Sequence, residues 1–470
     1  MTPEAIVAHR EGEYSISRQA FTGTLRDGRC YIQVWRGWIL RSYHWVDQRV
    51  KKWIDVLIAL GNASAEAAFA LAEVIGLTPG ETSSLWNQLL SMGVLVSWPN
   101  GDASPCIPHQ SNLGVLPHSP VEGHFNHELL KTNSPYSVKF EVSTKCNLRC
   151  GFCYVANVSQ QHYISLEDAV TVLKRLRTAG VVELSLTGLE ATLHPGIAQV
   201  VSTSERLGFR TMLLTNGLCF RDDLWEVLAC SRRTEVRITY HSCDDQQFDA
   251  FVGLHGARRA IRLNLVRLRD VGVPVVATVV VNRTNESWIR ATVAELESER
   301  IPYLVSSIIL PNVGKVRSPL ETNDYLSSTA VLSDLLKHGI THRRRRECAA
   351  ARTKAWVASN GDVFACELAK SLPIGNVLKT DFLKVWGSET AEEMRSHYGL
   401  EPDRCRTCSS RPRCPHCPAL AELERGRPDA VYSVFCETTT FIERQHTQSP
   451  GDGLENGNSK PVGRKSAIQS

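Results

Sequence analysis

Ten of the fifteen cysteines in this 470-residue chain fall into two groups whose spacing suits metal binding. The first group is Cys146, Cys150 and Cys153, in the order Cys-x3-Cys-x2-Cys, directly after a short β-branched stretch. Three thiolates suit an iron-sulfur cluster that leaves one iron free for another ligand. A structural zinc ion would require a fourth ligand nearby, and none is evident. The first group therefore favours an iron-sulfur cluster over zinc.

The second group contains seven cysteines near the carboxyl end of the chain. Two Cys-x2-Cys pairs within it are typical of zinc sites, but only five residues separate them. Zinc ribbons and fingers have spacers of about 12 to 20 residues, so this spacing disfavours zinc. We expect the five scattered cysteines to be small apolar side chains of the core. The seven grouped cysteines are Cys348, Cys366, Cys405, Cys408, Cys414, Cys417 and Cys436.

The elements that must position these cysteines alternate between strands and helices. β-Branched runs predict strands over 138–142, 181–186, 210–214, 235–239, 273–281 and 303–309, and helices are predicted over 166–179, 198–207, 257–271 and 288–299. This alternation is typical of an α/β fold with a parallel sheet, and six units predict a partial (β/α)6 TIM-like barrel. Ligands of such barrels bind at the carboxyl ends of the strands, where the first cysteine group lies.

The first cysteine group, with Phe152 before its third cysteine, resembles the signature of the radical S-adenosylmethionine (radical SAM) superfamily. The stretch 186–191, with Gly188 and Glu190, resembles that family's Gly-Gly-Glu-Pro loop, although Leu189 and Ala191 depart from it. The resemblance implies a 4Fe-4S cluster on the three cysteines and S-adenosylmethionine as cofactor. It also implies that S-adenosylmethionine is cleaved reductively to a 5'-deoxyadenosyl radical that abstracts hydrogen from a substrate. The implied S-adenosylmethionine-binding residues are Phe152, Gly188, Glu190, Asn216 and Thr239.

The second cysteine group resembles the SPASM domain, a carboxyl-terminal extension that houses auxiliary 4Fe-4S clusters. The departure is Cys414-x2-Cys417, where the family usually has three intervening residues. By this resemblance, Cys348, Cys366 and Cys417 hold an inner auxiliary cluster, whose fourth ligand is open or is not a cysteine. The outer auxiliary cluster is then held by Cys405, Cys408, Cys414 and Cys436. Three 4Fe-4S clusters are implied in all.

The amino-terminal region is expected to be a separate module. Helices are predicted over 50–60, 65–75 and 81–92, and strands over 30–35 and 38–40, with a further short strand after the last helix. This outline resembles the winged-helix-like domain with which peptide maturases bind a leader peptide by strand addition. The expected domains are 1–99 for this module, 100–134 for a linker, 135–342 for the barrel, 343–440 for the SPASM domain and 441–470 for a disordered tail.

Composition and charge exclude other classes of protein. With 43% hydrophobic and 22% charged residues, the chain is neither disordered nor fibrous. The net charge of 53 − 49 = +4 gives no strong footprint for nucleic acid or an anionic membrane. The apolar run 275–281 is much shorter than the roughly 20 residues of a membrane span. Because the amino terminus lacks the pattern of a secretory signal, we expect a cytoplasmic protein.

The leading hypothesis is a peptide maturase that installs a thioether or carbon-carbon crosslink in a ribosomally made precursor peptide. The implied partners are that peptide, with its leader on the amino-terminal domain, and reduced flavodoxin or ferredoxin as electron donor. One alternative is a protein side-chain oxidase of the sulfatase-maturase type. A DNA-binding redox regulator is disfavoured, because residues 81–92 carry no Lys or Arg. Cys243 and Asp244 either line the cavity or are structural, and the catalytic base is not identified.

Overall fold

The computed structural model describes the chain with several gaps. Phe152, residues 100–119 of the expected linker, the segment 307–346 and the expected tail 441–470 lie outside the described residues. The described residues are 13–16, 20–36, 39–60, 63–92, 94–98, 120–151, 153, 161–231, 233–306, 347–411, 414, 416–433, 435–436 and 439–440.

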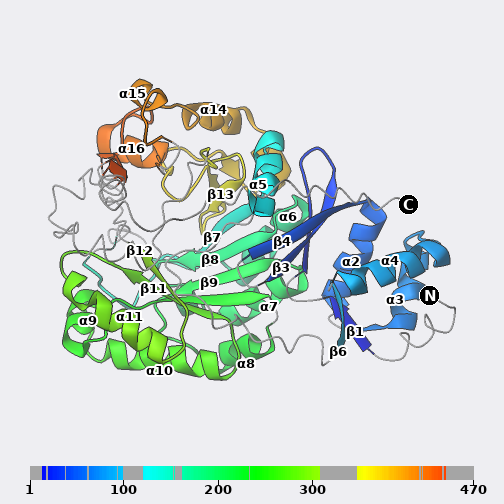
Figure 1. Ribbon diagram of the computed structural model, residues 1–470, viewed down its shortest axis with the longest axis horizontal. Helices are drawn as coiled ribbons and strands as arrows, with labels where there is room; N and C mark the ends of the chain where they lie inside the picture. Colours follow the sequence, from blue (N-terminus) through cyan, green and yellow to red (C-terminus); the bar gives the residue numbers. More distant parts are fainter. Residues whose placement is uncertain are drawn as a thin grey trace, which may run out of the picture.

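A sheet of nine strands forms the centre of the molecule (Figure 1). Six of its strands are parallel and lie in chain order, so the predicted partial barrel is confirmed. These strands are β7 (Ser137–Ser143), β8 (Glu183–Gly188), β9 (Arg210–Thr215), β10 (Thr234–Thr239), β11 (Val275–Val280) and β12 (Tyr303–Ser306).

Helices connect these strands. The four helices predicted in this region are confirmed to within a few residues, whereas α8 and α9 were not predicted. The connecting elements are α6 (Leu166–Thr178), η2 (Ala191–Leu193), α7 (Ile197–Arg206), α8 (Asp222–Cys230), α9 (Asp245–Val252), α10 (Ala257–Asp270), η3 (Glu286–Trp288) and α11 (Ile289–Ser298).

The two faces of the sheet differ in polarity. On β7, Val138 and Phe140 are buried and belong to the same apolar core as Val172 of α6. Side chains alternate between the faces of a strand, so Lys139 and Glu141 lie on the opposite face. Because the helices cover the apolar face, the charged face lines the interior of the partial barrel.

The sheet continues into the carboxyl-terminal region. Strand β13 (Lys354–Val357) pairs with β7 in parallel, with Val357 beside Phe140. Strands β14 (Asp362–Phe364) and β15 (Gly375–Asn376) extend it in antiparallel fashion. The remaining elements are α13 (Phe382–Trp386), α14 (Glu389–His397), α15 (Asp403–Arg406) and α16 (Pro418–Arg425). The regions expected as separate barrel and SPASM domains therefore share one sheet.

The amino-terminal region contains two small antiparallel sheets. One has the order β5-β1-β6 and packs with the three predicted helices. The last helix begins with a capping box. The Thr78 hydroxyl oxygen accepts a hydrogen bond from the Glu81 N–H, and the Glu81 carboxylate accepts one from the Thr78 N–H. The elements are β1 (Glu13–Ile16), α2 (Gln48–Leu60), β5 (Ala63–Ser64), α3 (Ala65–Val74), α4 (Pro79–Ser91) and β6 (Leu95–Trp98).

The second small sheet packs with the same helices through Ala20 and Ile32, and it also packs toward the barrel. Its strands are β2 (Ala20–Thr24), β3 (Cys30–Arg36) and β4 (Ile39–Val46). Tyr31 of β3 packs with Tyr136, just before β7, and with Phe125. Phe125 lies on α5 (Pro120–Thr132), so the prediction that 100–134 is a linker is wrong for residues 120–132. Burial of Phe125 and Leu129 against this sheet stabilises a helix that has little amphipathic pattern of its own.

No helix within the described part of the chain is long and apolar enough to span a membrane.

Candidate active site

The carboxyl ends of four neighbouring strands bring the predicted cofactor residues to one edge of the sheet. The loop with Cys146 follows β7, Glu190 follows β8, Asn216 follows β9, and Thr239 ends β10. Asn216 Nδ2 donates a hydrogen bond to Asn147 Oδ1 at 2.7 Å and lies 4.0 Å from Cys146 Sγ. The structure thus brings Asn216 against the first cysteine group.

The loop of the first cysteine group is anchored on a helix that the sequence did not reveal. The Arg149 N–H donates to the Val252 carbonyl at 2.9 Å, and the Gly151 N–H donates to the Phe251 carbonyl at 3.3 Å. Both acceptors lie at the end of α9, which Gly253 terminates with a φ of +71°. A Cβ at Gly253 would lie 3.1 Å from Arg149 Cβ, so the close approach of helix and loop favours glycine.

The three thiols of this loop lie in partly buried surroundings close to one another. Burial raises the pKa of Cys146, and burial together with the neighbouring Cys146 and Cys153 raises the pKa of Cys150 to about 12. Such thiols stay protonated at neutral pH unless a metal displaces their protons. No three His, Cys, Asp or Glu side chains in the described residues converge as ligands of a single metal ion would. Three cysteines in this spacing are a donor set that fits an iron-sulfur cluster, which binds each cysteine to a different iron.

Glu190 is a buried hub that joins the loops after β8 and β9. Its Oε1 accepts hydrogen bonds from Thr215 Oγ1 at 2.6 Å, Thr192 Oγ1 at 2.7 Å and the Thr192 N–H at 3.0 Å. Its Oε2 accepts one from the Asn216 N–H at 2.6 Å. Burial raises the pKa of Glu190, while these donors favour the charged form. The carboxylate therefore fixes Asn216 through protein contacts.

Gly188 is required where β8 approaches β7. Its φ is +146°, and a Cβ there would lie 2.0 Å from the Ser143 carbonyl oxygen. The Leu189 N–H donates to the same carbonyl at 3.0 Å, so Leu189 enters the loop without disturbing this contact. Ala191, the second departure from the family pattern, is fully buried at the start of η2.

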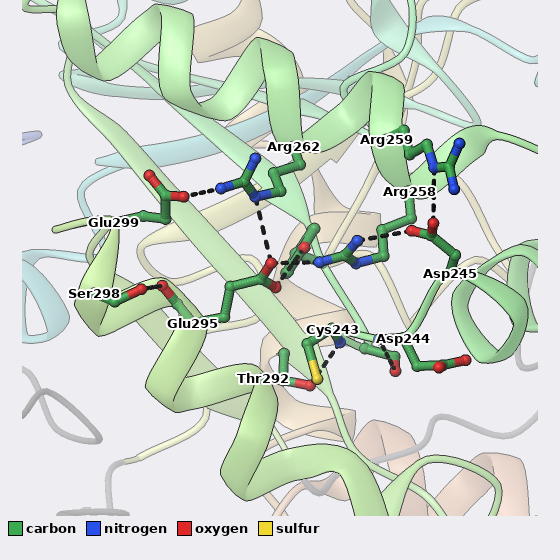
Figure 2. Close-up of polar contacts among 12 residues, drawn as sticks. Cys243, Asp244, Asp245, Arg258, Arg259, Arg262, Thr292, Glu295, Ser298 and Glu299 are labelled. Carbon is green, nitrogen blue, oxygen red and sulfur yellow. Dashed lines mark hydrogen bonds and ion pairs between the residues drawn. The ribbon is translucent and has the colours of Figure 1, made fainter.

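Of the residues around the end of β10, Thr239 is half-buried on the interior face, Cys243 contacts α11 through its backbone, and Asp244 caps α9. The Cys243 N–H donates to Thr292 Oγ1 at 2.9 Å, and the Asp244 carboxylate caps α9 by accepting from the Gln247 N–H at 2.8 Å. Figure 2 shows both residues beside α9 and α11. The contact of the Asp244 carboxylate agrees with the structural alternative, and the role of the Cys243 thiol stays a prediction.

An ion-pair network in the same view holds the three helices α9, α10 and α11 together (Figure 2). Arg258 of α10 contacts Asp245 of α9 at 2.7 Å and also Glu295 of α11. The hydroxyl of Tyr240, just after β10, donates to Glu295 at 2.7 Å. Because α9 anchors the cysteine loop, this network supports the site from outside.

In the second cysteine group, the structure brings together the three cysteines predicted for the inner cluster. Cys348, Cys366 and Cys417 pack with the same buried alanines and Tyr398. Burial raises the pKa of all three thiols, that of Cys417 to about 12. The negative charge that Cys348 and Cys417 carry when ionised adds to the rise in the pKa of Cys366. This donor set, like the first, suits a cluster that displaces the thiol protons.

Of the four cysteines predicted for the outer cluster, Cys405 lies on α15, Cys408 is exposed just after that helix, and Cys414 and Cys436 are half-buried. Cys405 and Cys408 are joined by a backbone hydrogen bond, and the Cys414 N–H donates to the Ser410 carbonyl at 3.0 Å. Arg404 Nη2, next to Cys405, lies 3.5 Å from Cys436 Sγ. Their assignment to one cluster stays a prediction.

Charged residues on the interior face connect β7 with the inner cysteines, and no sequence pattern had indicated them. Lys139 Nζ lies 2.6 Å from Glu367, the residue after Cys366. Lys370 Nζ lies 3.9 Å from Glu141 Oε2 and 3.7 Å from the ring centre of Trp356. The partners in both ion pairs are separated by more than 200 residues, so only the fold identifies them.

Two family models match the chain. Residues 140–296 match the model described as the radical SAM superfamily, and residues 348–409 match SPASM, described as an iron-sulfur cluster-binding domain. The first matched segment contains β8 to β11 and most of β7, and the second contains Cys348, Cys366, Cys405 and Cys408 but ends before Cys414, Cys417 and Cys436.

Curated proteins and solved structures extend this similarity. The sporulation killing factor maturation protein SkfB of Bacillus subtilis (strain 168) is 28% identical over 152 residues, which are 32% of this chain and 37% of that protein. The PqqA peptide cyclase of Gluconobacter oxydans (strain 621H) is 23% identical over 301 residues, 59% of this chain and 84% of that protein. Streptococcus suis SuiB bound to precursor peptide SuiA shares the fold over 90% of this chain and 100% of its own, with 18% identity and a TM-score of 0.56.

Proposed function

We propose that this chain, a member of the radical SAM superfamily with a SPASM domain, installs a crosslink in a ribosomally made precursor peptide. The observation that carries the proposal is that the first cysteine group and Cys366 of the second group both lie next to the polar interior of the partial barrel. The loop with Cys146 lies at the carboxyl end of β7, and Cys366 lies beside the charged interior face of the same strand through the Lys139–Glu367 pair.

The residues would divide among the cofactors as follows. Cys146, Cys150 and Cys153 would hold the cluster that binds S-adenosylmethionine, which Phe152, Gly188, Glu190, Asn216 and Thr239 would surround. Two auxiliary clusters would be held by Cys348, Cys366 and Cys417 and by Cys405, Cys408, Cys414 and Cys436.

When bound, the reduced cluster and S-adenosylmethionine supply a 5'-deoxyadenosyl radical that removes one hydrogen atom from the substrate. The chain's own residues orient this chemistry. Glu190 fixes Asn216 against the cysteine loop, and Gly188 lets β8 approach Ser143 closely. Auxiliary clusters held by the second cysteine group would supply an acceptor for the electron that must leave when a crosslink forms.

The peptide substrate is supported by the amino-terminal module and by the relatives. The small sheet β5-β1-β6 offers strand edges on which a leader peptide could add by main-chain hydrogen bonds. SuiB, whose fold extends over 90% of this chain, was crystallised with its precursor peptide SuiA. SkfB is named as the maturation protein of a sporulation killing factor, and the PqqA cyclase is named as a peptide cyclase. We assign reduced flavodoxin or ferredoxin as electron donor and the cytoplasm as location within the same proposal.

The first test measures iron and acid-labile sulfide per chain after anaerobic reconstitution. We expect about twelve iron in the parent and about eight in the Cys146→Ala, Cys150→Ala, Cys153→Ala variant, the counts for three and two 4Fe-4S clusters. About four iron in the parent, lost in the variant, would leave no auxiliary clusters and contradict the crosslinking proposal.

The second test identifies the reaction. Short peptides encoded beside the gene are incubated anaerobically with the reconstituted enzyme, reductant and S-adenosylmethionine, and their masses are measured. A crosslinked product has lost two hydrogens and yields linked fragments on tandem mass spectrometry. An oxidised side chain without a link would favour the sulfatase-maturase type of activity instead.

A further inference from the structure

The hairpin of β13 and β14 connects the two cysteine groups. Cys348 precedes β13 and Cys366 follows β14, so both lie at the open end of the hairpin. The turn at 358–361 closes the other end, with the Ala358 N–H donating to the Asp362 carbonyl at 2.8 Å. Because β13 runs parallel to β7, this turn lies near the end of β7 that leads into the loop of Cys146.

A chain of hydrogen bonds joins this turn to the start of the cysteine loop. Ser359 Oγ lies 3.3 Å from Glu141 Oε1 on β7 and 2.7 Å from His162 Nε2. His162 Nδ1 lies 3.3 Å from Thr144 Oγ1. The Thr144 N–H also donates to the His162 carbonyl at 3.0 Å, and the His162 N–H donates to Thr144 Oγ1 at 2.8 Å. Thr144 stands two residues before Cys146.

Along this series of hydrogen bonds, the donors and acceptors are complementary. A carboxylate only accepts, so the Ser359 hydroxyl donates to Glu141 and its oxygen is left to accept from His162 Nε2–H. The Thr144 hydroxyl lies within reach of two acceptors on His162, the carbonyl oxygen at 3.2 Å and Nδ1 at 3.3 Å. Ser359 is 5% exposed, so water has little access to its partners. Loss of its hydroxyl would therefore remove a hydrogen bond from both Glu141 Oε1 and His162 Nε2 without an easy replacement.

We infer that Ser359 and His162 are positioning residues, which hold the loop of Cys146 in register with the hairpin that carries Cys348 and Cys366. This inference rests on the proposed function for the identity of the groups that these cysteines hold. The chain of hydrogen bonds fixes Thr144 from the SPASM side, whereas α9 fixes Arg149 from the barrel side. Residues 144 and 149–151 of the loop are thereby held from two sides.

The test is a double-mutant cycle on the anaerobically reconstituted full-length protein, using Ser359→Ala, His162→Ala and their combination. Hydrogen exchange followed by mass spectrometry is measured for the peptides that contain Thr144 and His162. Each single variant should accelerate this exchange about fivefold, and the combination should add little, because both remove the same connection. Ser204→Ala is the matched control, since its buried hydroxyl on α7 donates to the Val201 carbonyl at 2.7 Å.

A second readout is the electron paramagnetic resonance spectrum of the reduced protein before and after addition of S-adenosylmethionine. We expect an altered spectrum of the first cluster in both single variants at unchanged iron content, and the parent spectrum in Ser204→Ala. Exchange at Thr144 that equals the parent's, or effects of the single variants that multiply in the combination, would overturn the inference. The exchange result stands even if no peptide is ever modified, so it is separable from failure of the proposed function.

Discussion

Replacement of Asp55 by Asn should loosen the amino-terminal module from the barrel. Asp55 on α2 accepts a hydrogen bond from Arg177 Nη2 of α6 at 3.0 Å and pairs with Lys51 and the Thr22 hydroxyl. Arg177 Nη1 donates to the Thr22 carbonyl at 3.0 Å. The Asn side chain keeps an acceptor for Thr22 but loses the charge that faces the two cations.

The loss of stability expected for Asp55→Asn follows from the partial burial of the Arg177–Asp55 ion pair. Removing one partner of a buried ion pair destabilises a protein by about 3–5 kcal/mol, and an exposed pair contributes about 0–1 kcal/mol. The side chains of Arg177 and Asp55 are 10% and 30% exposed, and Arg177 keeps its backbone acceptor. We therefore expect about 2 kcal/mol, which corresponds to about 30-fold faster hydrogen exchange in β2 and α2.

The stability that the Asp55 carboxylate contributes should decrease at low pH. Burial raises the pKa of Asp55, but the charges of Arg177 and Lys51 outweigh burial and hold the pKa below its ordinary value. Stability from a carboxyl with a lowered pKa is present above the unfolded value of about 3.9 and is lost as the pH falls through the folded value. The difference between parent and variant should therefore shrink below about pH 4.

The matched control is Asp429→Asn, which breaks an exposed pair with Arg427. It should leave the exchange of β2 and α2 unchanged. Equal exchange in Asp55→Asn and Asp429→Asn at neutral pH would refute the idea that this pair joins the module to the barrel.

Three further substitutions test the site and the module. Gly188→Ala places a Cβ against the Ser143 carbonyl and should abolish reductive cleavage of S-adenosylmethionine, whereas Gly76→Ala, also at positive φ but with open space around it, should not. Glu190→Gln turns an amide toward backbone donors and should destabilise the loops by about 2 kcal/mol, seen as weaker S-adenosylmethionine binding in equilibrium dialysis; normal binding would contradict the hub role. Thr78→Ala removes the cap of α4 and should cost about 1 kcal/mol, measured as faster exchange confined to that helix.

The sequence predicted those parts of the fold whose pattern is local. The six parallel strands and the longer helices carry uninterrupted apolar periodicity, and their bounds agree to within a few residues. Helices α8 and α9 are short, with few positions to establish a period, although Asp244 and Gly253 are a cap pair that could have marked α9. Helix α5 was not predicted because its burial depends on sheet residues such as Trp35, which lies 125 − 35 = 90 residues before Phe125.

The same division holds for the site. The spacing of Cys146, Cys150 and Cys153 is local, so the sequence alone is enough to predict them as cluster ligands. The role of Glu190 as a hub depends on Thr215 and Asn216, and the pairing of Lys139 with Glu367 spans 228 residues. Contacts of this kind have no signature in one sequence, because they exist only after strands from distant segments have paired.

The pairing of β13 with β7 has a consequence for exchanging parts between enzymes of this kind. A chain truncated before Lys354 would leave one side of β7 without its hydrogen-bonding neighbour, and β7 is the strand that leads directly into Cys146. An unpaired strand edge invites association between chains. Grafts of a foreign carboxyl-terminal domain should therefore be joined after β15, so that the recipient keeps its own hairpin, with donor segments starting at or beyond α13.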